Sequence, residues 1–128
     1  MFTFHYDERS GILRIRVVGA WSLDEIHRYG REAGPQFATA RRKAGALRLL
    51  IDLIDADLLR KEFVEPLARA GMRHGRADDR VAMVLCSSLM KLQMKRMIGN
   101  APSEMFLSDG AAQTWLMAYD EAKQADVG

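Results

Sequence analysis

Three aspartates stand at the end of an apolar run, and their residue type and spacing suit metal or acid–base chemistry. Asp52, Asp55 and Asp57 end or follow the run 47–53. Carboxylates at a strand end can hold Mg²⁺, and crowding can raise the pKa of one of them enough for proton transfer. Aspartates also favour turns after strands, and Asp57 suits a helix N-cap. Because no second cluster of acids or paired histidines completes a metal set, we favour the turn and cap interpretation and expect no metal.

A thiol and two hydroxyls follow the second apolar run, 80–85, in the same way. Cys86 would lie where a strand meets a helix N-terminus, which stabilises the thiolate that a nucleophile needs. Ser87 and Ser88 could bind an anion at the same helix end. No histidine stands in a recognised relation to Cys86, and a helix-capping role accounts for either serine. We therefore favour structural roles and expect no catalytic residue and no cofactor.

Three methionines give the best indication of a binding surface that is not catalytic. Met90, Met94 and Met97 fall on one face of a predicted helix, and Leu89 and Leu92 widen that apolar arc. A methionine face at helical spacing is often part of a core. Flexible thioethers also suit adaptable surfaces for a protein partner or a lipid. An exposed remainder of this arc would mark an interface.

The two apolar runs indicate the fold that must position these residues. Short, near-continuous aliphatic runs are typical of strands buried on both faces, as in a parallel sheet covered by helices. Ligands of such sheets bind outside the carboxyl ends of the strands. The aspartates, Cys86 and the serines therefore define the expected ligand region.

The rest of the chain predicts an α/β domain with the order ββαβαβαβα and a mostly parallel sheet. An N-terminal hairpin is expected from alternating residues around a turn at 7–11. Ser22 and Glu25 form a capping box that begins the first helix, and Gly34-Pro35 should kink or interrupt it. Further strands are expected at 47–53, 80–85 and 103–107, each followed by a helix, with the last helix fraying from Glu121.

This order resembles the STAS domain superfamily, and most closely its SpoIIAA-like branch, the STAS/Sec14-like domains. The resemblance is carried by Gly11 to Gly19, by Leu47 to Leu53 and by Met72-Arg73-His74 leading into Asp79 to Val84, and it is completed by Met105 to Asp109 with the last helix. It implies a small, usually non-enzymatic module that binds proteins or apolar ligands. The related CRAL-TRIO domains transfer lipids.

The chain departs from classical anti-sigma-factor antagonists at one motif. Those proteins carry a phosphorylatable serine shortly after the core strand that here ends at Asp52. The corresponding stretch is about 58–61, and no serine occurs from Asp52 to His74. The phosphorylation switch is therefore not expected.

Length and composition exclude several classes of protein. The 128 residues suit a single domain, 1–128, with a net charge of +2 and one cysteine. That charge is too small to indicate nucleic acid, and the tight basic run at 41–43 suits a helix C-terminus. No apolar run reaches about 18 residues, and no signal peptide is evident. A cytoplasmic location is expected.

Three functions remain open from the sequence. The first is a STAS-like regulatory or interaction module that self-associates or docks a protein partner. The second is a carrier of an apolar small molecule or lipid. The third is an enzyme or phosphate-binding domain that uses the strand-end cluster, and it ranks last because no phosphate loop or triad is present.

Overall fold

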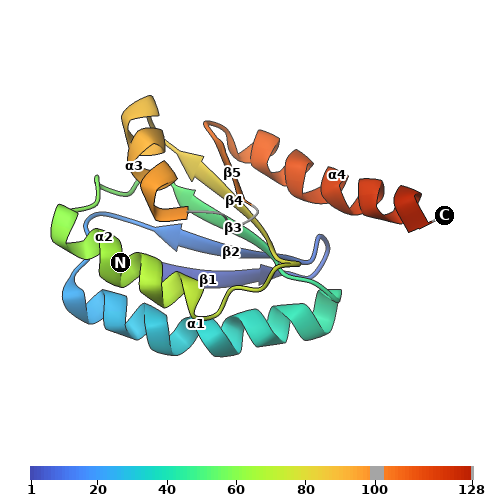
Figure 1. The fold of residues 1–128 in the computed structure, drawn as a ribbon, viewed down its shortest axis with the longest axis horizontal. Helices are drawn as coiled ribbons and strands as arrows, with labels where there is room; N and C mark the ends of the chain where they lie inside the picture. Colours follow the sequence, from blue (N-terminus) through green and yellow to red (C-terminus); the bar gives the residue numbers. More distant parts are fainter. Residues whose placement is uncertain (99–102, 128) are drawn as a thin grey trace.

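A computed structural model of the chain describes residues 1–98 and 103–127 (Figure 1). Over these residues the elements follow the predicted order ββαβαβαβα. The strands are β1 (Phe2–Asp7), β2 (Ile12–Val17), β3 (Arg48–Leu53), β4 (Arg80–Leu85) and β5 (Ser103–Phe106). The helices are α1 (Leu23–Ala44), α2 (Lys61–Met72), α3 (Ser88–Ile98) and α4 (Asp109–Val127).

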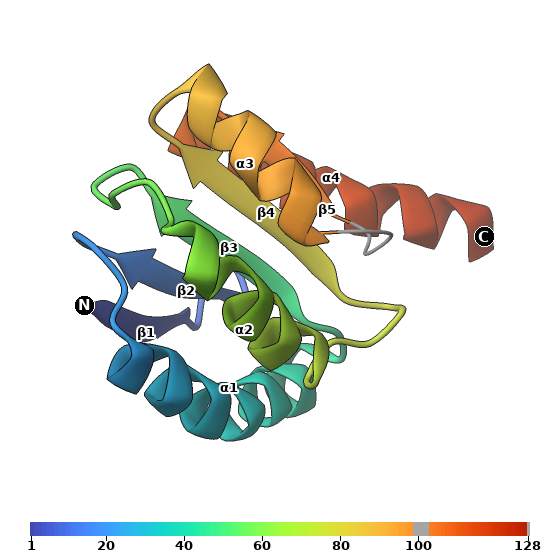
Figure 2. The same cartoon turned by 60° about the vertical axis from the view of Figure 1, so that its left-hand side comes forward.

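The strands form one sheet in sequence order, β1-β2-β3-β4-β5. β1 is antiparallel to β2, and the remaining neighbours are parallel, as the two apolar runs predicted. Because crossovers between parallel strands are right-handed, successive crossovers in one direction place their helices on one face. Figure 2 shows α1, α2 and α3 on that face and α4 on the other.

The alternation of β3 explains why its sequence is apolar nearly throughout. Leu49 and Leu53 belong to the core between the sheet and α1–α3, whereas Leu50 belongs to a second core beneath α4. The second core also includes Ala112 and Leu116 of α4. A strand buried on both faces needs apolar side chains at successive positions, which confirms the interpretation of the run.

Helix α1 is not interrupted at Pro35, contrary to the expectation from Gly34-Pro35. Ser22 caps the helix by accepting a hydrogen bond from the Glu25 backbone N–H at 3.1 Å, and Gly45 ends it with a φ of +84°. Proline removes one backbone donor, but an apolar stripe along the helix stays buried on both sides of it. The stripe consists of Ile26, Tyr29, Ala33, Phe37 and Ala40.

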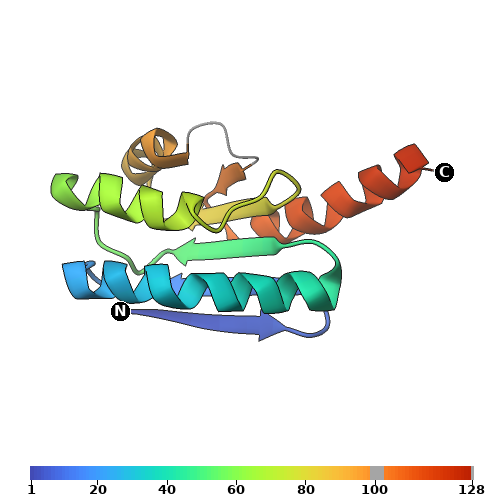
Figure 3. The ribbon, with the colours of Figure 1, turned by 60° about the horizontal axis from the view of Figure 1, so that its bottom comes forward.

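Helices α1 and α2 run side by side over the sheet (Figure 3). His74, just beyond α2, points back to α1, where its Nε2 lies 3.0 Å from the Gly30 carbonyl oxygen. A Cβ at Gly34 would stand 2.9 Å from the His74 ring, so this approach requires a glycine. The contact fixes the C-terminal end of α2 beside α1.

Two further expectations about helices have definite outcomes. The last helix was expected to fray from Glu121, but α4 continues as a helix to Val127. Within the described residues no helix is both long and apolar enough to cross a membrane.

Candidate functional site

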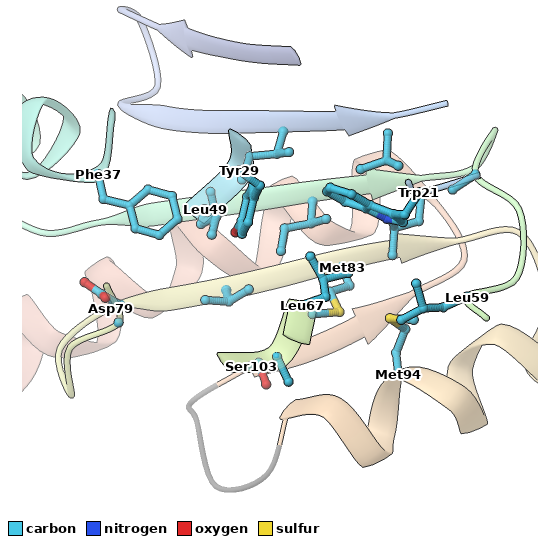
Figure 4. A pocket seen from close by; sticks show the side chains of 18 of the residues that line it. Trp21, Tyr29, Phe37, Leu49, Leu59, Leu67, Asp79, Met83, Met94 and Ser103 are labelled. Atoms are coloured by element: carbon cyan, nitrogen blue, oxygen red, sulfur yellow. The ribbon is translucent and has the colours of Figure 1, made fainter. Parts of the chain in front are cut away.

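A large apolar cavity lies between the sheet and helices α1–α3 (Figure 4). Its volume is about 740 Å³, within the range of about 300–1,000 Å³ that is usual for small-molecule sites. By comparison, a dry apolar cavity of about 150 Å³ already binds benzene. The lining residues are Ile15, Val17, Trp21, Tyr29, Phe37, Leu47, Leu49, Ile51, Leu53, Ala56, Asp57, Leu59, Leu67, Ala68, Gly75, Arg76, Ala77, Asp79, Val81, Met83, Met90, Met94 and Ser103.

The cavity extends along the whole length of β3. Its floor includes alternate residues of this strand region, from Leu47 through Leu49 and Ile51 to Leu53. At about 3.3 Å per residue these positions span roughly 20 Å. The shape therefore suits a long, narrow molecule better than a compact one.

The charged lining residues belong to loops at the two ends of the cavity. Asp57 follows β3, whereas Arg76 and Asp79 precede β4. Asp79 is buried and forms an ion pair with Arg41 of α1, with 2.6 Å between Nη2 and Oδ2. The lining along the strands between these loops is almost entirely apolar.

Tyr29 introduces a hydroxyl group into this apolar lining. It comes from α1 and lies against the rings of Phe2, Phe4 and Trp21, with centroid distances of 5.7, 6.2 and 5.8 Å. Burial raises the pKa of Tyr29 to about 12, because the phenolate would be poorly solvated here. The group is therefore a neutral phenol at physiological pH.

The predicted aspartates lie outside the cavity, except for Asp57. Asp52 and Asp55 face arginines of β2: Asp52 Oδ2 is 3.8 Å from Arg14 Nη1, and Asp55 pairs with Arg16. Asp52 also accepts a hydrogen bond from the Ile54 backbone N–H at 3.1 Å, which is the predicted turn role. Two of the three carboxylates are thus neutralised by cations.

Asp57 does not cap a helix, which corrects one of its two expected roles. Helix α2 begins at Lys61, and the Asp57 backbone N–H instead donates to the Gly19 carbonyl oxygen at 3.0 Å. This bond and the bridge between Gly19 and Ala56 hold the loop beside the strand end, so its backbone is already committed. Among the described residues, no three His, Cys, Asp or Glu side chains gather as a metal site.

An ion pair beside these aspartates joins β2 to α4. Arg14 binds Asp109 at two points, with 2.5 Å between Nη1 and Oδ1 and 3.2 Å between Nη2 and Oδ2. The hydrogen bonds from Arg14 lower the pKa of Asp109 below its ordinary value, and the same bonds raise the pKa of Arg14. The strand-end charges therefore form a network that links structural elements.

Cys86, Ser87 and Ser88 lie at the junction of β4 and α3, as predicted. Cys86 is exposed rather than buried. Ser87 caps α3, because its hydroxyl accepts a hydrogen bond from the Met90 backbone N–H at 3.2 Å. Ser88 is exposed in the first turn of α3. Whether a ligand binds at this junction stays a prediction.

The methionine face of α3 lies against the cavity. Met90 and Met94 are 2% and 6% exposed and belong to both the core and the lining. The side chain of Met97 lies outside the described residues. Leu89 and Leu92 are 62% and 63% exposed, so an apolar remainder of the arc does face solvent, as the helix pattern indicated.

Sequence reasoning missed the cavity itself. Tyr29 and Phe37 are buried residues of α1 and Trp21 precedes this helix, but nothing in their sequence pattern distinguishes a lining residue from a core residue. Apolar side chains at helical or strand spacing look alike in both settings. The difference depends on how helices α1–α3 are placed above the sheet, which these sequence patterns do not specify.

Comparison with known proteins shows the fold. No known family profile matches the sequence, and no curated protein of similar sequence is found. An uncharacterised protein with a SpoIIAA-like fold from Shewanella loihica is similar, with a TM-score of 0.64 and 18% identity over 91% of this chain and 92% of that one. An anti-sigma factor antagonist from Mycobacterium paratuberculosis gives a TM-score of 0.59 and 16% identity over 91% and 94%. The chain therefore has a SpoIIAA-like fold, as the resemblance predicted.

Proposed function

We propose that the protein is a non-enzymatic SpoIIAA-like module that binds and carries a long apolar molecule between its sheet and helices α1–α3. The observation that supports this function is the cavity of about 740 Å³ with its apolar lining. An apolar ligand in this space would give the lining side chains packing contacts on the side that faces the cavity. Ligand binding would therefore stabilise the folded protein by mass action.

Two further features agree with a role other than phosphorylation or catalysis. No serine occurs between Asp52 and His74, where classical anti-sigma antagonists carry their phosphorylated residue. Asp52 and Asp55 are held by Arg14 and Arg16, so their charges serve ion pairs. The exposed thiol of Cys86 suits a reducing compartment, and we place the protein in the cytoplasm.

Mass spectrometry of a solvent extract tests the proposal. The full chain is expressed in its native host, purified without detergent and extracted, and the extract should contain an apolar compound in near-stoichiometric amount. An extract without such a compound from correctly folded protein would contradict the function.

A cavity-blocking variant provides the matched control. Val81 lies on β4 opposite Leu49 and lines the cavity, so Val81→Trp should displace the ligand from the extract. Met117→Trp adds the same side chain to the partly exposed surface of α4 on the other face of the sheet, and should retain the ligand. Equal recovery from both variants would place the compound elsewhere on the protein.

A second candidate function is docking of a protein partner on α3. It is favoured by the exposed side chains of Leu89 and Leu92, which stand one helical turn apart on the same helix. Leu92→Glu should abolish capture of such a partner while leaving the ligand in the extract. A partner still captured at wild-type level by Leu92→Glu would exclude this surface.

A further inference from the structure

The hydroxyl group of Tyr29 is a polar group that faces an apolar cavity. Tyr29 is 6% exposed, and among the described residues its hydroxyl takes part in no hydrogen bond. Figure 4 shows the oxygen directed away from α1 into the space above β3 and β4. A buried polar group without a partner costs about 1–3 kcal/mol, so such groups are uncommon unless something outside the chain satisfies them.

The position of the hydroxyl limits what can bind to it. Figure 4 places Tyr29 between Phe37 and Trp21, away from Asp79 at one end of the cavity. The charged lining residues stand in the loops beyond the strand ends, and the neighbours of Tyr29 are aromatic rings. A charged group at Tyr29 would lose its hydration without gaining a counter-ion. An uncharged oxygen would lose much less and would form one hydrogen bond.

We propose that the Tyr29 hydroxyl binds an uncharged oxygen of the ligand, so that the natural ligand is a long apolar molecule carrying a hydroxyl or carbonyl group. Tyr29 can donate to either group and accept from a hydroxyl. The apolar chain then lies along β3, over Leu49 and Ile51. This inference rests on the proposed ligand-binding function, and it adds the chemical class of the ligand and the residue that orients it.

Trp21 can serve as a fluorescent probe of ligand binding because it lines the cavity next to Tyr29. Trp115 of α4 packs against Phe106 of β5, so Trp115→Phe removes the only other tryptophan from a region outside the cavity. In this background, titration of Trp21 fluorescence with octanol, octane and octanoate gives a dissociation constant for each. Octanol should bind more tightly than octanoate.

Tyr29→Phe then tests the hydrogen bond. Losing one neutral hydrogen bond should weaken octanol binding about fivefold, whereas octane binding should stay unchanged. Phe37→Leu is the matched control, since it alters an apolar lining residue and should change the binding of octanol and octane in the same proportion.

The outcomes separate this inference from the proposed function. If neither octanol nor octane binds the Trp115→Phe protein and its extract is empty, the ligand-binding function fails, and the inference fails with it. If both bind and Tyr29→Phe weakens them equally, or leaves octanol binding unchanged, only the inference is overturned. Tighter binding of octanoate than of octanol would also overturn it, because a cation such as Arg76 at the end of the cavity would then hold the polar end of the ligand in place of the Tyr29 hydroxyl.

Discussion

The guanidinium group of Arg41 and the carboxylate of Asp79 form a buried two-point ion pair that joins α1 to the loop before β4. Nε lies 3.1 Å from Oδ1, and Nη2 lies 2.6 Å from Oδ2. Asp79 also accepts a hydrogen bond from the Arg76 backbone N–H, and Arg41 donates to the His74 carbonyl oxygen. The pair therefore fixes the loop that closes one end of the cavity.

Removing the carboxylate of this pair should be strongly destabilising. Asp79→Ala leaves the largely buried guanidinium of Arg41 with the His74 carbonyl oxygen but without a counter-ion, and removing one partner of a buried ion pair typically costs about 3–5 kcal/mol. Urea denaturation measures the loss. Glu65→Ala is the control, because it breaks the exposed pair between Glu65 and Arg69 and should change stability far less. Equal effects of the two substitutions would show that the Arg41 pair is not buried in solution.

Truncation of two residues of α3 should lower stability to very different extents. Met94 is 6% exposed and packs in the core, so Met94→Ala should lower the free energy of unfolding by about 2 kcal/mol, the low end for a residue beside a cavity. Leu92 is 63% exposed, and Leu92→Ala should stay within about 0.5 kcal/mol of wild type. Urea denaturation distinguishes them, and similar losses would mean that α3 is rotated about its axis.

The strands and their order along the chain could be predicted because a strand that is buried on both faces has apolar residues at successive positions. The runs at 47–53 and 80–85 correspond to β3 and β4. Proline was misleading, because the propensity of Pro35 to break a helix is local, whereas the buried stripe from Ile26 to Ala40 acts along the whole of α1. Tertiary packing outweighed local propensity at that point.

The candidate site could be predicted only in part. Strand ends indicated where Asp52, Asp55 and Asp57 lie, but not that Arg14 and Arg16 would pair with the first two, since that depends on the β2–β3 register. The cavity could not be predicted from the sequence, because its lining consists of ordinary core residue types. How far two helices stand apart above a sheet depends on packing between distant segments.

The pair between Arg14 and Asp109 should make stability depend on acidic pH. Its hydrogen bonds lower the pKa of Asp109 below the ordinary value of 3.8 in the folded state, so the unfolded state binds its proton first as the pH falls. The contribution is therefore fully present above pH 3.8 and is lost as the pH falls through the lowered pKa.

Asp109→Asn tests this dependence by urea denaturation between neutral pH and the lowest pH at which the protein stays folded. The variant should be less stable than wild type at pH 7, and the difference should shrink as the pH falls below 3.8. The partly exposed pair should also weaken with added salt. A difference that stays constant across the pH range would show that Asp109 acts as a helix-start residue rather than as a charge.

Tyr29→Phe should raise the stability of the ligand-free protein and reduce the stabilisation that the ligand provides. In the ligand-free protein, after extraction and refolding, the substitution removes a hydroxyl that faces an apolar cavity and has no hydrogen-bond partner among the described residues, and the free energy of unfolding should rise by up to about 1 kcal/mol. In protein saturated with octanol the hydroxyl is satisfied, so the variant should gain less from the ligand than wild type does. Thermal unfolding of both forms measures the two differences. A ligand-free variant less stable than wild type would mean that the hydroxyl already has a partner within the folded chain.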